Sequence, residues 1–160
     1  MIRIFSILLF LNLCFLAVDS VFGQTTLYSY TSGDWNTATT WTTDAGGTVL
    51  VGSQVPSAGD IVVILPSRTV SLSANITTTN LDITIQAGGF LDNGNFLFTQ
   101  ILVALRGQGI MRISSANFPA ATVNSFVQPG GGTTEYYNSA SFNMPSQALY
   151  NNLTIYLSNG

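Results

Sequence analysis

Short apolar segments, separated by polar turn-forming residues, recur along the chain after Gln24. In Leu81–Ile85 every second residue is apolar. No stretch after Gly23 keeps the apolar period of a helix. A period of two predicts strands, because successive side chains of a strand point to opposite faces. The expected strands are Ile61–Leu65, Thr69–Ser73, Leu81–Ile85, Phe96–Thr99, Ile101–Arg106, Ile110–Ser114, Thr122–Val127, Thr133–Tyr137 and Leu153–Leu157.

Turn signals separate most of these strands. Gly supplies positive φ, Pro fixes φ, and Asn and Asp tolerate the left-handed region. Asp92–Asn95 is interpreted as a type I′ turn centred on Asn93-Gly94, and Pro129–Gly132 as a turn between coils. The chain is therefore predicted to be all-β. Two architectures fit this pattern: a right-handed parallel β-solenoid (β-helix) with an N-terminal cap, and an antiparallel β-sandwich.

Internal similarity favours the solenoid. Asn80–Gly88 and Asn152–Gly160 share the pattern N-L-x-I-x-[I/L]-x-x-G. Repeats of a fixed period indicate stacked architectures, in which each unit packs on the previous one.

A second, shorter similarity predicts the register of the coils. Gly89–Asp92, Gly109–Arg112 and Gly132–Glu135 each begin with Gly and end in a charged residue. Their spacing of roughly 20 residues is a plausible length for one coil of a solenoid. If coils stack about 4.8 Å apart, Asp92, Arg112 and Glu135 form an outward ladder of alternating charge. The residues then expected to point inward are Leu91, Met111, Thr134, Ile113 and Tyr136.

The segment Met1–Gly23 has the pattern of a secretory signal peptide. Arg3 supplies the positive charge, Ile4–Val18 is an apolar run of about 15 residues, and the small residues Val21 and Gly23 place the cut before Gln24. An uncleaved membrane anchor and a lipid-modified Cys14 are the alternatives. A secreted or cell-surface location follows. The cleaved chain would hold no Cys for a disulfide and no membrane span.

The chain is expected to divide into three parts: the signal peptide 1–23, an N-terminal cap segment 24–60, and β-solenoid coils over 61–160. A solenoid normally ends in a polar cap, and no such segment follows Leu157. We therefore expect the sequence to be the N-terminal piece of a longer protein. The alternative is that Leu153–Leu157 closes the domain by itself.

Composition narrows the possible functions. The 160 residues are 46 % hydrophobic and 7 % charged, with a net charge of −3, four Arg, no Lys and no His. Few cations argue against nucleic-acid binding. Because the chain has no His, it cannot form a catalytic triad with a His base. Because it also has only one Cys, it cannot form a metal site built from His and Cys ligands. We expect the protein to have no enzymatic activity and to bind no cofactor or metal ion.

Trp35 and Trp41 are the candidate binding residues. Exposed indole rings can stack on sugar rings, whereas buried ones would pack over the open end of the first coil.

The mature aspartates show no calcium-loop spacing, and catalysis would need two carboxylates within roughly 5–10 Å across a cleft. Of the adjacent Tyr136 and Tyr137, one is expected in the core. The aspartates concerned are Asp34, Asp44, Asp60, Asp82 and Asp92.

Several segments together resemble the start of large secreted surface proteins of Bacteroidetes. The segments that carry the resemblance, over nearly all of the mature chain, are Ser32–Asn36, Thr40–Thr42, Val55-Pro56, Gly59–Ile64, Leu105–Gly109, Phe118-Pro119, Tyr136–Asn138 and Tyr150–Ile155. The resemblance implies a β-helix-like extracellular stalk or adhesin-type region, often exported by the type IX system, and supplies no catalytic residues.

Two functions are therefore expected as alternatives. The first is a non-enzymatic structural or adhesin-type module of a larger surface protein, with surface glycans or other cell-surface proteins as partners. The second is a carbohydrate-binding module attached to a polysaccharide-degrading enzyme.

Overall fold

Two β-sheets of six strands each make up the fold. The computed structural model describes residues 23–114, 117–137 and 149–156. A short 3₁₀ helix, η1 (Ala38–Thr40), precedes β3. In spatial order the first sheet contains β3 (Trp41–Thr42), β1 (Thr26–Ser29), β4 (Ile61–Ile64), β6 (Asp82–Ile85), β8 (Leu102–Gly107) and β10 (Ala121–Asn124). The second contains β2 (Gly33–Asp34), β5 (Thr69–Ser71), β7 (Phe90–Gly94), β9 (Ile110–Ile113), β11 (Thr133–Tyr137) and β12 (Asn152–Tyr156).

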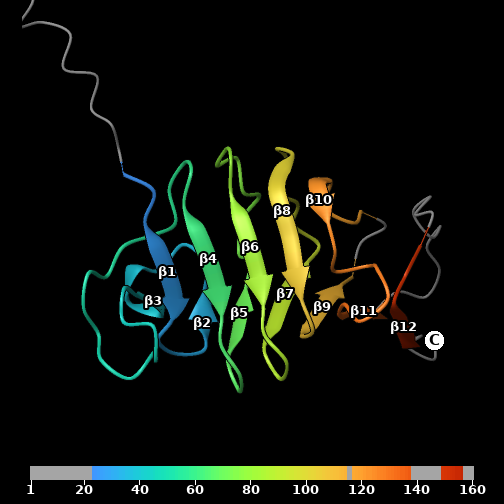
Figure 1. Cartoon of the computed structure of the whole chain (residues 1–160), viewed down its shortest axis with the longest axis horizontal. Helices are drawn as coiled ribbons and strands as arrows, with labels where there is room; N and C mark the ends of the chain where they lie inside the picture. Colours follow the sequence, from blue (N-terminus) through green and yellow to red (C-terminus); the bar gives the residue numbers. More distant parts are fainter. Residues whose placement is uncertain (1–22, 115–116, 138–148, 157–160) are drawn as a thin grey trace, which may run out of the picture.

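The chain winds from one sheet to the other and advances by one strand at each return. From β4 to β11, consecutive strands alternate between the sheets, and each strand from β4 to β9 pairs in parallel with the equivalent strand one coil later. Figure 1 shows the first sheet in front and the second behind, with the windings forming a right-handed coil. The predicted parallel β-solenoid is confirmed, and an antiparallel sandwich is wrong.

Apolar side chains stack in continuous rows inside the coil. In the first sheet Ile83 is the register partner of Val62 on one side and of Leu105 on the other, and all three are 0 % exposed. In the second sheet the corresponding row is Val70, Leu91, Met111 and Thr134, with Thr134 1 % exposed. Ile113 and Tyr136 form a further buried pair in that sheet. Burial of each large apolar side chain contributes about 1.5–3 kcal/mol, so these rows stabilise the fold.

The turns that leave the first sheet also stack on one another. Ser67 donates its backbone N–H to the Gly88 carbonyl oxygen at 2.8 Å, one coil away. Positive φ recurs here: 60° at Ser67, 80° at Gly88, 104° at Gly107 and 83° at Gly130. The last of these lies in Pro129–Gly132, which links β10 to β11 and is the predicted turn.

The cap and the first coil share residues 24–60. β1 pairs in parallel with β4, and β2 with β5, so the coils begin before residue 61, where they were expected to start. The antiparallel strand β3 then ends the first sheet. The sequence did not reveal these strands, because β2 and β3 span only two residues each and β1 contains the polar residues Thr26 and Ser29.

Three other expectations need correction. Phe96–Thr99 is not a strand, and only an isolated bridge joins Phe98 to Ile76. Asp92-Asn93-Gly94 is not a type I′ turn: it belongs to β7, whose pairing shifts between Asp92 and Gly94 in a β-bulge. The repeat of Asn80–Gly88 at Asn152–Gly160 does not mark equivalent strands, since β6 and β12 lie in different sheets. Positions 157–160 of that repeat lie outside the described residues.

Candidate functional site

A ladder of charged side chains runs across the outer face of the second sheet. Asp92 of β7 is the register partner of Arg112 of β9, and Arg112 is the partner of Glu135 of β11. The predicted ladder of alternating charge is confirmed. Parallel pairing places equivalent residues of successive coils side by side, so three charges that are distant in sequence become neighbours.

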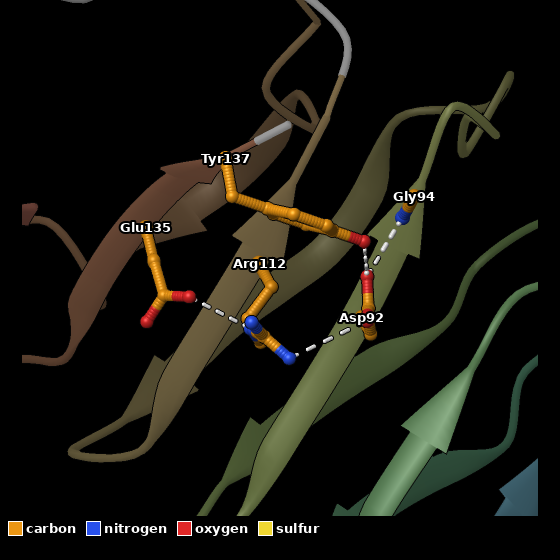
Figure 2. A network of polar contacts seen from close by, with 5 residues as sticks. All are labelled: Asp92, Gly94, Arg112, Glu135 and Tyr137. Atoms are coloured by element: carbon orange, nitrogen blue, oxygen red, sulfur yellow. Dashed lines mark hydrogen bonds and ion pairs between the residues drawn. The ribbon is translucent and has the colours of Figure 1, made fainter. Parts of the chain in front are cut away.

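Arg112 bridges the two carboxylates (Figure 2). Its Nε donates to Glu135 Oε1 at 2.8 Å, and its Nη1 lies 3.8 Å from Asp92 Oδ2. The hydrogen bond to Glu135 raises the pKa of Arg112. The Glu135 side chain is only 11 % exposed, so this pair is shielded from solvent more than an ordinary surface ion pair.

Tyr137 closes the network from the strand that carries Glu135. Its hydroxyl donates to Asp92 Oδ1 at 2.7 Å, and its ring lies 4.8 Å from the Arg112 guanidinium carbon. Asp92 Oδ1 also accepts the Gly94 N–H at 3.0 Å (Figure 2). Burial and then the hydrogen bond to Asp92 raise the pKa of Tyr137 to about 12. Tyr137 is therefore a protonated donor at neutral pH.

The network is arranged to neutralise charge and to fix register. Arg112 lies between Asp92 and Glu135 and occupies the space in which a substrate would have to contact both carboxylates. Cation–π contact and charge-assisted hydrogen bonds each stabilise such a cluster. Its chemistry is that of a clamp joining the coils of β7, β9 and β11.

The other arginines in the described part of the chain differ from Arg112. On the first sheet Arg106 forms an ion pair with Asp82 at 3.2 Å, and the Arg106 side chain is 44 % exposed. Arg68 donates its Nε to the Tyr30 carbonyl oxygen at 3.0 Å. Among the residues that the structure describes, no ion pair of Arg68 is formed.

Trp35 and Trp41 lie in the core at the capped end. Both are 0 % exposed, and their rings pack edge to face with centroids 5.1 Å apart. Trp41 Nε1 donates to the Trp35 carbonyl oxygen at 2.8 Å, and Phe98 packs against Trp35 at 5.3 Å. Sugar stacking needs an open ring face, so the sugar-stacking role considered for Trp35 and Trp41 does not fit this geometry.

The aspartates of the N-terminal segment organise its loops. Asp60, 3 % exposed, accepts hydrogen bonds from the backbone of Thr25 and from the backbone and hydroxyl of Ser57. Asp44 accepts the N–H groups of Thr48 and Val49 at 2.8 and 3.0 Å. These two bonds lower the pKa of Asp44. Asp34 accepts the Asn36 N–H at 2.8 Å. Across the described ranges no cluster of three or more metal-ligating side chains forms.

Tyr136 and Tyr137 point to opposite faces, as expected for neighbours in a strand. Tyr136 is 1 % exposed in the core, and its hydroxyl lies 3.1 Å from that of Tyr150. Burial and this hydrogen bond raise the pKa of Tyr136. The part played by Tyr137 in the ladder was not predicted, because the alternating charges alone gave no signal for an aromatic partner.

Comparison with protein families, with curated proteins and with solved structures found no match. The similarity to Bacteroidetes surface proteins therefore remains an interpretation of the sequence. Among the described residues, no helix has the length and apolar character needed to span a bilayer.

Proposed function

We propose that this chain is a non-enzymatic extracellular β-solenoid module, a structural or adhesin-type unit of a larger surface protein. The observation that best supports this role is the Arg112 clamp, which joins three successive coils through two carboxylates. A stalk or adhesin must hold its length and register outside the cell, and such cross-coil contacts serve that purpose.

The surface and core chemistry agree with the same role. The core rows are apolar except for Thr134. Thr and Asn supply several outward positions of the strands, such as Thr69, Thr84, Thr133 and Asn152. The chain has no disulfide partner for Cys14. Stability outside the cell would then come from burial and from the parallel ladders of backbone hydrogen bonds.

Export through a cleaved signal peptide is part of the proposal. The full coding sequence would be expressed in a bacterial host, and the product recovered from the periplasm or medium would be sequenced from its N-terminus. We expect the mature protein to begin at Gln24. A product that stays in the membrane fraction and begins at Met1 would show an uncleaved anchor instead.

Activity assays test the non-enzymatic part. The secreted protein would be incubated with a panel of plant, algal and microbial polysaccharides, and released reducing ends would be measured. We expect none. Turnover that disappears in a Glu135→Gln variant with unchanged circular dichroism would contradict the proposal and place catalysis at the ladder.

A further inference from the structure

An open hollow of about 390 Å³, with a mixed polar and apolar lining, lies where three connecting segments meet, next to the capped end of the solenoid. Tyr30 and Thr31 come from the turn between β1 and β2, Gly47 and Thr48 from the loop after β3, and Arg68 from the turn between β4 and β5. Its volume is near the lower end of the range of about 300–1,000 Å³ for small-molecule sites, but the hollow is open to solvent, so a ligand would lie on the surface and not be enclosed.

Hydrogen bonds between side chains and backbone fix the walls of this hollow. Arg68 Nε is bonded to the Tyr30 carbonyl oxygen, and Thr69 donates its N–H to Ser32 Oγ at 2.9 Å. Gly47 is buried, and a Cβ there would lie 2.9 Å from the Ser29 carbonyl oxygen. The loop after β3 therefore lies directly against the end of β1 and against Leu65. A site held in this way is formed before a ligand arrives, which lowers the entropic cost of binding.

Arg68 gives the hollow its binding chemistry. Arg106 and Arg112 each contact a carboxylate, whereas within the described ranges Arg68 contacts none. One of its five N–H groups is bonded to Tyr30, so the four on its two terminal nitrogens remain for a ligand. A guanidinium binds a planar carboxylate through two parallel N–H···O bonds.

An acidic side chain contacts the lining of the hollow. Asp44 accepts a hydrogen bond from the Thr48 hydroxyl at 3.1 Å. Its oxygens are already bonded to the backbone N–H groups of Gly46, Thr48 and Val49. The Thr48 oxygen keeps its lone pairs for a donor. Tyr30 and Thr31 are also hydroxyl-bearing residues of the lining, so the hollow suits a ligand with several hydroxyl groups.

We propose that this hollow binds the carboxylate of a sugar acid, such as a uronic acid residue of an acidic polysaccharide. Arg68 binds the carboxylate, and the Thr residues of the lining bind ring hydroxyls. A neutral sugar lacks the group that Arg68 recognises. This site is separate from the charged ladder and does not depend on the structural role proposed above.

Titration of the secreted protein with galacturonic acid tests the assignment. Two-dimensional NMR should show saturable shifts centred on the amides of Tyr30, Thr31, Gly47 and Thr48. Galactose, which differs by having no carboxylate, should give none. Binding by Arg68→Gln should be at least about tenfold weaker, because a charge-assisted pair is lost. Arg106→Gln, which removes an exposed arginine from the first sheet, should bind like the parent protein.

Four results would overturn this site. They are no binding of galacturonic acid, equal binding of galactose, shifts elsewhere on the surface, and equal loss of binding in Arg106→Gln. Sodium sulfate separates a sugar-acid site from a general anion site, and sulfate binding as tight as that of galacturonic acid would contradict the sugar assignment. Arg68→Lys keeps the charge but not the planar fork, so intermediate binding is expected even if Arg68→Gln folds poorly.

Discussion

The Arg112 guanidinium and the Glu135 carboxylate lie 2.8 Å apart although they are distant in sequence. Because Arg112 also faces Asp92, replacing it leaves two carboxylates without their cation. We expect Arg112→Met to lower the free energy of unfolding by about 1–3 kcal/mol, since the Glu135 side chain is nearly buried. Urea denaturation followed by circular dichroism would measure this change.

Arg106→Met is the matched control for that experiment. Its ion pair with Asp82 is more exposed, and exposed pairs contribute about 0–1 kcal/mol. Equal losses for Arg106→Met and Arg112→Met would show that the ladder stabilises the fold no more than a surface ion pair does.

Tyr137 should make stability fall at alkaline pH. Its pKa in the folded protein, about 12, lies above the ordinary value of 10.0. The neutral hydroxyl therefore stabilises the fold fully below about pH 10, and this contribution is lost as the pH rises through about 12. Burial of Tyr136 acts in the same direction. Urea midpoints at pH 8, 10 and 11.5 should decline less steeply in Tyr137→Phe; an unchanged slope would argue against this link.

Asn93 should be replaceable by an apolar residue. It is 0 % exposed in the bulge of β7, and neither its side-chain oxygen nor its nitrogen has a hydrogen-bond partner. An unpaired buried amide is costly, so Asn93→Leu should raise the free energy of unfolding by about 1 kcal/mol. Asn93→Asp, which buries a charge, should lower it. A loss of stability in Asn93→Leu would mean that the amide has a partner, such as a buried water molecule.

Gly107 should not tolerate a side chain. Its φ is 104°, and a Cβ would collide with the Ile85 carbonyl oxygen of the previous coil. Gly107→Ala should therefore cost at least about 2 kcal/mol. Gly130 has a φ of 83° but open space around its Cβ position, so Gly130→Ala should cost only about 1–2 kcal/mol. Thermal unfolding of the two variants would separate the effect of the steric clash from that of backbone strain. Equal losses of stability in Gly107→Ala and Gly130→Ala would show that the clash contributes nothing.

The sequence carried enough information for the coil register but not for the capped end. Gly at a fixed distance before a charged residue marks equivalent positions of successive coils, so Asp92, Arg112 and Glu135 were placed correctly. β2 and β3 span only two residues each, and β1 contains Thr26 and Ser29, so none of the three shows a clear apolar period. Phe96–Thr99 has the apolar composition of a strand because Phe98 packs on Trp35 in the core. The segment does not pair as a strand.

The turn signal of Asn93-Gly94 failed for a related reason. Asn-Gly is the strongest short hairpin signal, yet Gly94 has a φ of 52° inside a bulge rather than at a chain reversal. The Arg68 hollow was also missed. It depends on a contact between Arg68 and Tyr30, which are distant in sequence, and local patterns hold no information about such a pair.

Stacking equivalent residues of successive windings has a consequence for how this molecule can change over evolutionary time. Each winding touches mainly the one before and the one after, so a duplicated winding meets neighbours much like those it already had. Each added winding would thus lengthen the protein by about 4.8 Å while its core packing stays the same.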